Sequence, residues 1–238
     1  MAAREGSPPL VKARERALIV IGAPRSGTTL LATALGAHSR VALLSEDLNG
    51  GLFRVVGGKL PALKLCAPNQ IDLDRRWRPA YGLIEQNGWL RKNLGYRLPS
   101  SRLSLRDMAS RAELKVLCLL RDPDRNIDAL KRRENKRDAV CRDIVRRTYR
   151  LFRQLSGEPL MDMRVVSFDR FVRSPEQQLG AICDWLGLAF EPAMLEAPKL
   201  NPFYPEAGFR AEKAASPGAA PADAALDGEY RSLLASAL

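Results

Sequence analysis

Histidine and cysteine are scarce in this sequence. It contains one histidine, His38, and four cysteines that are far apart and form no C-x-x-C pair, Cys66, Cys118, Cys141 and Cys183. A site with several histidine ligands is therefore excluded, and the cysteine spacing argues against a zinc site. Isolated cysteines are typical of reduced thiols, which favours a cytoplasmic protein.

Long apolar segments are also absent. No apolar run approaches the roughly 20 residues that a transmembrane helix needs, so we expect no membrane span. Residues 1–16 contain no apolar core of the kind found in secretory signals, and we expect a flexible or weakly structured end there.

The length and charge balance bound the class of protein. At 238 residues the chain matches one α/β domain, with or without a small cap. Lysine and arginine outnumber aspartate and glutamate by 38 to 27, which gives a formal net charge of +11. This excess favours anionic partners, namely nucleotides, nucleic acids or acidic membrane surfaces, without choosing among them.

The clearest pattern lies near the N-terminus. Residues 17–22 are an apolar run rich in Ile and Val, which predicts a buried strand, and residues 29–37 are rich in Leu and Ala, which predicts a helix. We refer to residues 22–29 as the glycine loop, in which Gly22 and Gly27 have the spacing G-x-x-x-x-G. Strand, glycine-rich loop and helix are typical of phosphate binding, because backbone N–H groups and the positive helix end attract an anion.

The glycine loop differs from that of a nucleoside triphosphatase. Thr28 stands where a lysine would contact the β- and γ-phosphates, and the loop's cation is Arg25. A nucleotide that ends in a phosphosulfate needs neither that lysine nor Mg²⁺, so one loop cation and backbone N–H groups suffice. The alternative is a tight strand-to-helix turn without a ligand, which explains the two glycines, two threonines and basic residue less well.

The sequence APRSGTT after a buried strand resembles the 5′-phosphosulfate loop of the sulfotransferase family, and its tyrosylprotein, Golgi-type and bacterial members in particular. These enzymes transfer a sulfuryl group from 3′-phosphoadenosine 5′-phosphosulfate (PAPS) to a hydroxyl or an amine. The resemblance implies that six consecutive residues bind the donor: Pro24, Arg25, Ser26, Gly27, Thr28 and Thr29.

Acidic residues follow a second apolar run, residues 41–44. Glu46 and Asp47 are expected at the ligand-binding edge, where parallel strands end, although a solvated acidic loop is the alternative. In tyrosylprotein sulfotransferases an acidic residue at this distance from the loop is the catalytic base. The resemblance implies that role for Glu46, and we expect burial to raise its pKa towards about 6.

Lys64 is a further candidate site residue. Residues 63–66 predict a short strand, and KLCAP at residues 64–68 is similar to the Lys-Thr-His-Leu-Pro of cytosolic sulfotransferases. The resemblance implies that Lys64 contacts the transferred group, whereas the alternative is a surface lysine. Cys66 replaces the family's histidine base, but a neutral thiol is a poor base. His38 lies at the far end of the predicted helix, so Glu46 remains the predicted base.

Another buried strand is predicted over residues 115–120, followed by Arg-Asp-Pro. It resembles the family's second donor motif, in which the arginine binds the 3′-phosphate and a serine eight residues later assists. Arg121 matches, and its guanidinium suits a phosphate. Ala129 replaces the serine, so Asn126 or Arg125 is the predicted substitute. The alternative for Arg121 is an ion pair with the aspartate that follows it.

Two later segments also predict secondary structure. Residues 126–154 are highly charged with interspersed apolar residues, which predicts one or two helices with a solvated basic face or, alternatively, a surface for an anionic partner. Residues 163–168 predict a core strand. The next helix is predicted to start in a capping box, with Ser174 as N-cap, Pro175 in the first turn and Gln177 three residues after the cap.

We expect one domain over residues 17–200. Residues 70–112 are a candidate acceptor-binding cap, with a helix from residue 104. Residues 211–238 include an Ala/Pro-rich stretch and are predicted to be flexible or weakly structured, like residues 1–16.

The predicted fold is a three-layer α/β P-loop nucleotide-binding fold, with a mostly parallel central sheet and helices on both faces. The predicted function is PAPS-dependent sulfuryl transfer to a small-molecule or peptide acceptor without a metal. Glu46 takes the acceptor's proton, and Arg25 and Lys64 stabilise developing charge. The alternatives are a P-loop NTPase or small-molecule kinase, or a non-catalytic protein that binds nucleotides or, less favoured, nucleic acid.

Overall fold

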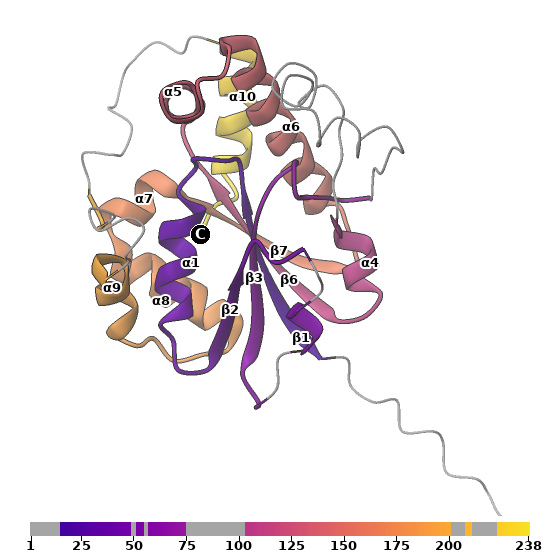
Figure 1. Cartoon of the computed structure of the whole chain (residues 1–238), viewed down its shortest axis with the longest axis vertical. Coiled ribbons are helices and arrows are strands. Elements are labelled where there is room, and N and C mark those ends of the chain that lie inside the picture. Colours follow the sequence, from indigo (N-terminus) through magenta and orange to yellow (C-terminus); the bar gives the residue numbers. More distant parts are fainter. Residues whose placement is uncertain (1–14, 49–50, 55–56, 75–102, 201–207, 211–222) are drawn as a thin grey trace, which may run out of the picture.

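The structure is a computed structural model that describes residues 15–48, 51–54, 57–74, 103–200, 208–210 and 223–238 (Figure 1). Its strands are β1 (Arg16–Gly22), β2 (Val41–Ser45), β3 (Leu60–Cys66), β4 (Ile71–Asp72), β5 (Leu103–Ser104), β6 (Glu113–Leu120) and β7 (Met161–Ser167). Its α-helices are α1 (Thr28–Gly36), α4 (Leu105–Ala109), α5 (Pro123–Glu134), α6 (Asp138–Ser156), α7 (Phe168–Arg173), α8 (Pro175–Leu186), α9 (Ala193–Glu196) and α10 (Ala224–Leu234). Two short 3₁₀ helices are η1 (Gly51–Arg54) and η2 (Ala197–Leu200).

The central sheet has five strands in the order β2-β3-β1-β6-β7, and all of its pairings are parallel. β1 lies in the middle, with β3 on one side and β6 on the other. The chain builds the β3 side first and then crosses to the β6 side, so the strand order reverses at β1. Ligands of such sheets bind beyond the carboxyl ends of the strands at this reversal.

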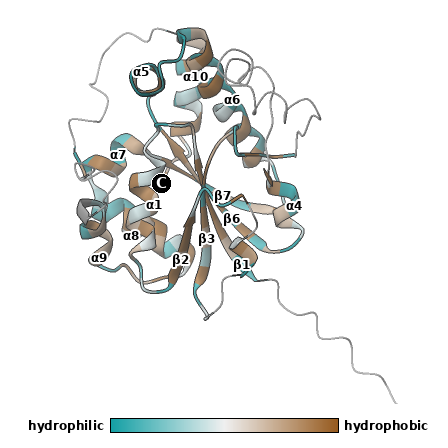
Figure 2. Cartoon of the chain, viewed as in Figure 1, coloured by the Kyte–Doolittle hydropathy of each residue, from teal (hydrophilic) through white to brown (hydrophobic). Residues whose placement is uncertain are grey.

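Helices cover both faces of the sheet, as predicted. Alternate residues of β1 point to opposite faces: Ile19 and Ile21 belong to a core with α4, α5, α6 and α10, whereas Leu18 and Val20 pack with α1, α7, α8 and α9. Figure 1 shows α1, α8 and α9 on one side of the sheet and α4 and α6 on the other. The central strands are mostly apolar (Figure 2), because a parallel sheet that is covered on both faces buries nearly every side chain.

Several predicted elements have different ends. The 126–154 segment forms two helices, α5 and α6, and the strand predicted to Phe168 ends at Ser167, where α7 begins. Ser104 caps α4 as expected, but this helix ends at Ala109. The predicted start of α8 is confirmed, with Ser174 as N-cap and Pro175 in the first turn, but the Ser174 side chain makes no capping hydrogen bond, so the capping box itself is not formed. Ser174 is also the C-cap of α7.

The C-terminal prediction is also wrong over part of its range. Residues 223–238, which we expected to be flexible or weakly structured, include α10, whose Leu226, Tyr230 and Leu233 are buried in the core. The backbone N–H of Leu238 donates to the carbonyl of Val165 in β7 at 2.9 Å. The predicted domain over residues 17–200 therefore omits a helix of the same core, while residues 211–222 lie outside the described residues.

The candidate cap is described only at its two ends. β4 and β5 pair in parallel as a second small sheet, which brings Ile71 beside Leu103. Residues 75–102, which make up most of the predicted cap, lie outside the described residues. Within the part of the chain that is described, no helix combines the length and apolar character needed to cross a bilayer.

Candidate active site

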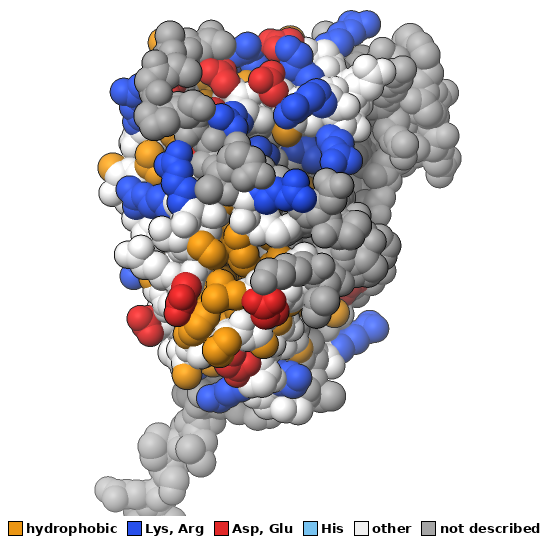
Figure 3. All heavy atoms as spheres, turned by 90° about the vertical axis from the view of Figure 1, so that its left-hand side faces the viewer, with side chains coloured by type: hydrophobic (Ala, Val, Ile, Leu, Met, Phe, Trp, Pro, Cys, Tyr) orange, Lys and Arg blue, Asp and Glu red, His pale blue; other side chains and the backbone are white. Residues whose placement is uncertain are grey.

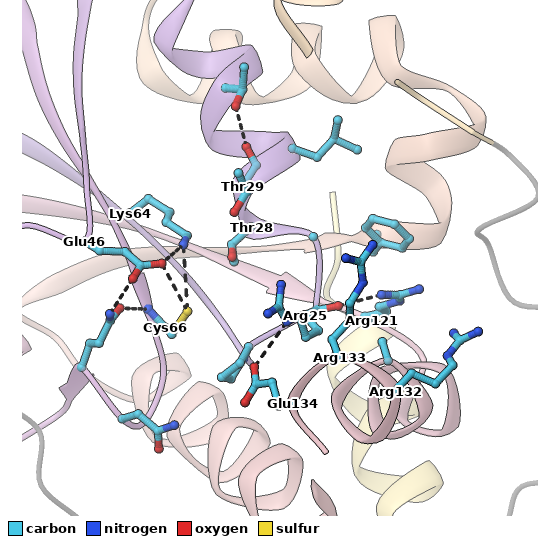
Figure 4. Close-up of a pocket in the computed structure, with 18 of the residues that line it drawn as sticks. Arg25, Thr28, Thr29, Glu46, Lys64, Cys66, Arg121, Arg132, Arg133 and Glu134 are labelled. Atoms are coloured by element: carbon cyan, nitrogen blue, oxygen red, sulfur yellow. Dashed lines mark hydrogen bonds and ion pairs between the residues drawn. The ribbon is translucent and has the colours of Figure 1, made fainter. Parts of the chain in front are cut away.

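A cavity of about 620 Å³ lies at the carboxyl ends of the central strands. All five strands contribute to its wall through the residues at or just beyond their ends (Figure 4). The lining includes Pro24, Arg25, Gly27, Thr28, Thr29, Thr33, Glu46, Lys64, Cys66, Asn69, Gln70, Arg121, Ala129, Arg132, Arg133, Glu134 and Phe168. The structure therefore brings most of the predicted site residues together, whereas Ser26, Asp47, Arg125 and Asn126 are not part of the cavity wall.

The glycine loop turns sharply between β1 and α1. Arg25 and Gly27 have positive φ angles of 66° and 102°. A Cβ on Gly27 would lie 2.4 Å from Cε2 of Phe168, so only glycine fits this close approach. Gly27 caps α1 without a side-chain hydrogen bond. The first turn of α1 lines the cavity, where its N–H groups and the positive helix end favour an anion.

Ser26 and Asn126, which were predicted to bind the donor, are buried and do not line the cavity. Ser26 is buried beneath the loop, its N–H donates to the carbonyl of Ala23 at 3.0 Å, and its Oγ has no hydrogen-bond partner in the described residues. The Nδ2 of Asn126 donates to the carbonyl of Pro24 at 2.9 Å. Asn126 is 1% exposed and holds the loop from below, so it does not replace the missing serine at the cavity wall.

Arg121 links the second motif to the glycine loop. Its Nη1 donates to the carbonyl of Arg25 at 2.6 Å, and its guanidinium lies 4.6 Å from the ring centroid of Phe168. Its Nε is buried without a hydrogen-bond partner among the described residues. The alternative ion pair with Asp122 is not formed, because the carboxylate of Asp122 caps α5 by accepting from the N–H of Arg125 at 3.0 Å. Burial lowers the pKa of Arg121.

Glu46 and Lys64 face each other across the ends of β2 and β3. The Nζ of Lys64 donates to Oε1 of Glu46, and Nε2 of Gln70 donates to Oε2 at 2.9 Å. The Lys64 side chain is 4% exposed and that of Glu46 is 45% exposed, so Lys64 is not a surface lysine and Glu46 is not wholly solvated. Gln70 also accepts from the N–H of Cys66 at 2.6 Å, which fixes its amide.

The predicted rise in the pKa of Glu46 is wrong. Burial raises this pKa, but the hydrogen bonds from Lys64 and Gln70, together with the charges of Lys64 and Arg25, lower it by more. The net pKa lies below the ordinary value of 4.5. Glu46 is therefore ionised at neutral pH while Lys64 is paired with it.

The other two candidate bases are poorly suited. Burial raises the pKa of the Cys66 thiol, so it stays neutral. His38 is buried outside the cavity wall, where its Nδ1 accepts from the N–H of Arg40 at 3.0 Å and its Nε2 donates to the carbonyl of Ala189 at 2.8 Å. Its ring thus ties the end of α1 to the chain after α8.

The last turn of α5 is the main feature that the sequence analysis missed. Arg132, Arg133 and Glu134 line the cavity, and Oε1 of Glu134 lies 3.3 Å from Nε of Arg25. A signal was present in the spacing. Arg132 and Arg133 follow Ala129 by three and four residues, which places them on the helical face of that position.

The described residues contain no cluster of potential metal ligands. In the described ranges, no three or more His, Cys, Asp or Glu side chains are arranged to hold a metal ion. Asp47, which we expected near the site, accepts through Oδ2 from the N–H of Gly51 at 2.6 Å and is not part of the cavity wall.

The parallel order of the sheet, the glycine loop after its central strand and the cavity at its reversal point define an α/β fold of the nucleotide-binding type.

No protein-family model matches the chain, and no curated protein matches it. Two similar solved structures are sulfotransferase domains. One, from the Synechococcus PCC 7002 olefin synthase, has 16% identity and a TM-score of 0.57 over 97% of each chain. The other, from the curacin biosynthetic pathway, has 16% identity and a TM-score of 0.56, covering 94% of this chain and 99% of that one. The chain therefore has the fold of sulfotransferase domains.

Proposed function

We propose that this protein is a PAPS-dependent sulfotransferase that acts on a hydroxyl or amine of a small-molecule or peptide acceptor in the cytoplasm. The observation that carries the proposal is the layout of the cavity. The positive end of α1 lies between two separate groups of charges, the Glu46–Lys64 pair and the arginines around Arg121 (Figure 4).

The cavity's own groups suit a donor with two anionic ends. The first turn of α1 with Thr28 and Thr29 would hold the 5′-phosphosulfate. Lys64 lines the same cavity and donates to Glu46 in this structure. Arg121 has a buried Nε without an acceptor, which a phosphate oxygen would supply. This unsatisfied donor and the positive end of α1 support a nucleotide with two phosphate groups.

Transfer breaks the bond between the sulfur and the bridging phosphate oxygen and forms a bond from sulfur to the acceptor oxygen or nitrogen. Glu46 takes the acceptor's proton, and the leaving nucleotide keeps the electron pair of the broken bond. Lys64 and Arg25 stabilise the charge that develops on the bridging oxygen. A basic Glu46 requires that Lys64 turn from its carboxylate to the donor, because the pair with Lys64 lowers the pKa of Glu46.

The proposal is tested first by binding. At a concentration of about 100 times its Kd, a ligand that binds only the native state adds about 2.7 kcal/mol, which raises Tm by about 5–11 °C in a chain of this size. We expect adenosine 3′,5′-bisphosphate to produce such a shift, and AMP or Mg-ATP to produce a smaller one at equal concentration.

The outcome with Mg-ATP separates the candidates. A larger shift with Mg-ATP would favour a P-loop NTPase or kinase, and a response to nucleic acid alone that weakens steeply with salt would favour nucleic-acid binding. Transfer itself is measured with ³⁵S-labelled PAPS against a panel of phenols, alcohols, amines and tyrosine peptides.

A further inference from the structure

We propose that Arg132 and Arg133 form the subsite that selects a nucleotide donor carrying a second phosphate. This inference rests on the proposed function, and it assigns a role to two residues of the basic helix face for which the sequence allowed either solvent exposure or an anionic partner. Both line the same cavity as Arg121 and the glycine loop.

The geometry of α5 places these arginines at the cavity. The helix begins at Pro123, directly after β6 and Arg121, so its axis leads away from the end of β6. Ala129, Arg132 and Arg133 occupy one face of the helix and line the cavity. Figure 4 shows Arg25, Arg121, Arg132 and Arg133 together on one side of the cavity, with Glu46, Lys64 and Cys66 on the other.

The charges on this side of the cavity do not balance. Glu134 pairs with Arg25 at 3.3 Å. In the part of the chain that the structure describes, neither Arg121, Arg132 nor Arg133 makes an ion pair with a carboxylate, and the Nε of Arg132 reaches only the carbonyl of Asp128 at 3.4 Å. Three guanidinium groups beside one cavity repel one another unless an anion lies between them. A phosphate monoester carries about two negative charges and matches the guanidinium fork.

Small and exposed neighbours leave room for such an anion. Ala129 has only a methyl group where it lines the cavity, and the side chains of Arg132 and Arg133 are exposed. Lysine and arginine side chains also gather on the upper part of the molecular face in Figure 3, at the level of α5 in Figure 1. An anionic nucleotide would meet this positive field as it approaches the cavity.

A purely structural role makes a different prediction. Basic residues in the last turn of a helix stabilise it through the helix dipole. Lys131 lies in the same turn, but its Nζ pairs with Asp138 at 3.0 Å and it is not part of the cavity wall. Lys131→Ala is therefore a matched control that removes one cation from the same helix end without touching the cavity.

The test is calorimetry with adenosine 3′,5′-bisphosphate and with AMP on the wild type, Arg132→Ala, Arg133→Ala, the double variant and Lys131→Ala. We expect each arginine variant to weaken adenosine 3′,5′-bisphosphate about 10–100-fold and AMP less than about threefold. The control should change neither affinity by more than about threefold. Exposed positions tolerate substitution, and an unchanged far-ultraviolet spectrum and Tm would confirm folding; if the double variant unfolds, the single variants decide.

Two results would overturn the inference, and they are distinguishable. If the wild type prefers adenosine 3′,5′-bisphosphate and the arginine variants keep that preference, or lose both ligands equally, the subsite is elsewhere and the proposed function stands. If the wild type binds both nucleotides equally, the proposed function and this inference both fail.

Discussion

Replacing Glu46 by Gln separates two roles of this carboxylate, as proton acceptor and as partner of Lys64. Gln has the same shape and keeps an oxygen for the Lys64 ammonium, but it has no charge and cannot accept a proton. We expect turnover to fall about 10²–10⁴-fold, which corresponds to about 2.7–5.5 kcal/mol in the activation barrier. Because the substitution frees Lys64 for the anion, nucleotide affinity should be unchanged or higher.

The cost to stability should be small. The Glu46 side chain is 45% exposed, so solvent screens its pair with Lys64 although the lysine is buried. We expect a loss of about 1 kcal/mol, equivalent to about 2–4 °C in Tm. The sign of its pH dependence follows from the lowered pKa. The pair stabilises the folded state above pH 4.5, the ordinary value for glutamate, and its contribution is lost as pH falls through the folded-state value. The difference between wild type and Glu46→Gln should therefore shrink below about pH 4.5.

A matched control comes from the other side of the cavity. Glu134 also lines it and also pairs with a cation, Arg25, at 3.3 Å. Glu134→Gln removes the same charge without removing the proposed base, so it should keep turnover within about tenfold. The assay is single-turnover transfer from labelled PAPS, combined with calorimetry. Full turnover in Glu46→Gln, or equal losses in the two variants, would refute the assignment of Glu46 as the base.

Three further substitutions test the cavity. Arg121→Ala should weaken adenosine 3′,5′-bisphosphate by about 1.5–3 kcal/mol and AMP by less, as measured by calorimetry, and equal losses would remove Arg121 from the phosphate site. Gly27→Ala should cost at least about 2 kcal/mol in a denaturant titration, because its Cβ would lie 2.4 Å from the Phe168 ring at a φ of 102°; a neutral effect would show that the loop is not packed in this way. Cys66→Ser should leave turnover nearly unchanged, since its thiol stays neutral, and a large loss would reopen its candidacy as the base.

The apolar runs were sufficient to predict the sheet. After their first residues, strands β1 and β6 are buried on both faces, so Ala17–Gly22 and Val116–Leu120 contain no charged residue, and short continuous apolar runs of this kind are typical of parallel strands. Gly22 and Gly27 located the loop because neither position has room for a side chain: a Cβ would lie 2.5 Å from Oγ of Ser26 at Gly22 and 2.4 Å from the Phe168 ring at Gly27. These features depend on neighbours along the chain, which a sequence displays directly.

The errors concern contacts between distant segments. The lowered pKa of Glu46 depends on Lys64 and Gln70, which follow it by 18 and 24 residues and whose side chains meet it only in the folded sheet. Asn126 lies under Pro24, a contact across 102 residues. Periodicity shows which face of a helix is polar, but it does not show whether that face meets solvent or a cavity, and this is why Arg132 and Arg133 were missed.

A substitution in the C-terminal helix α10 tests whether this helix packs against the distant helices α5 and α6. Its Leu226 is 1% exposed and belongs to the core formed with α5 and α6, and Asp223 at its start pairs with Arg146 of α6 at 3.1 Å. Because Leu226 is buried, Leu226→Ala creates a cavity and should cost about 2–5 kcal/mol, with a fall in Tm of about 4–20 °C. Ser232→Ala, on the exposed side of the same helix, should stay within about 0.5 kcal/mol of the wild type. Equal and negligible effects of both substitutions in thermal and urea unfolding would mean that this end of the chain is not part of the core, as the Ala/Pro-rich sequence before it had suggested.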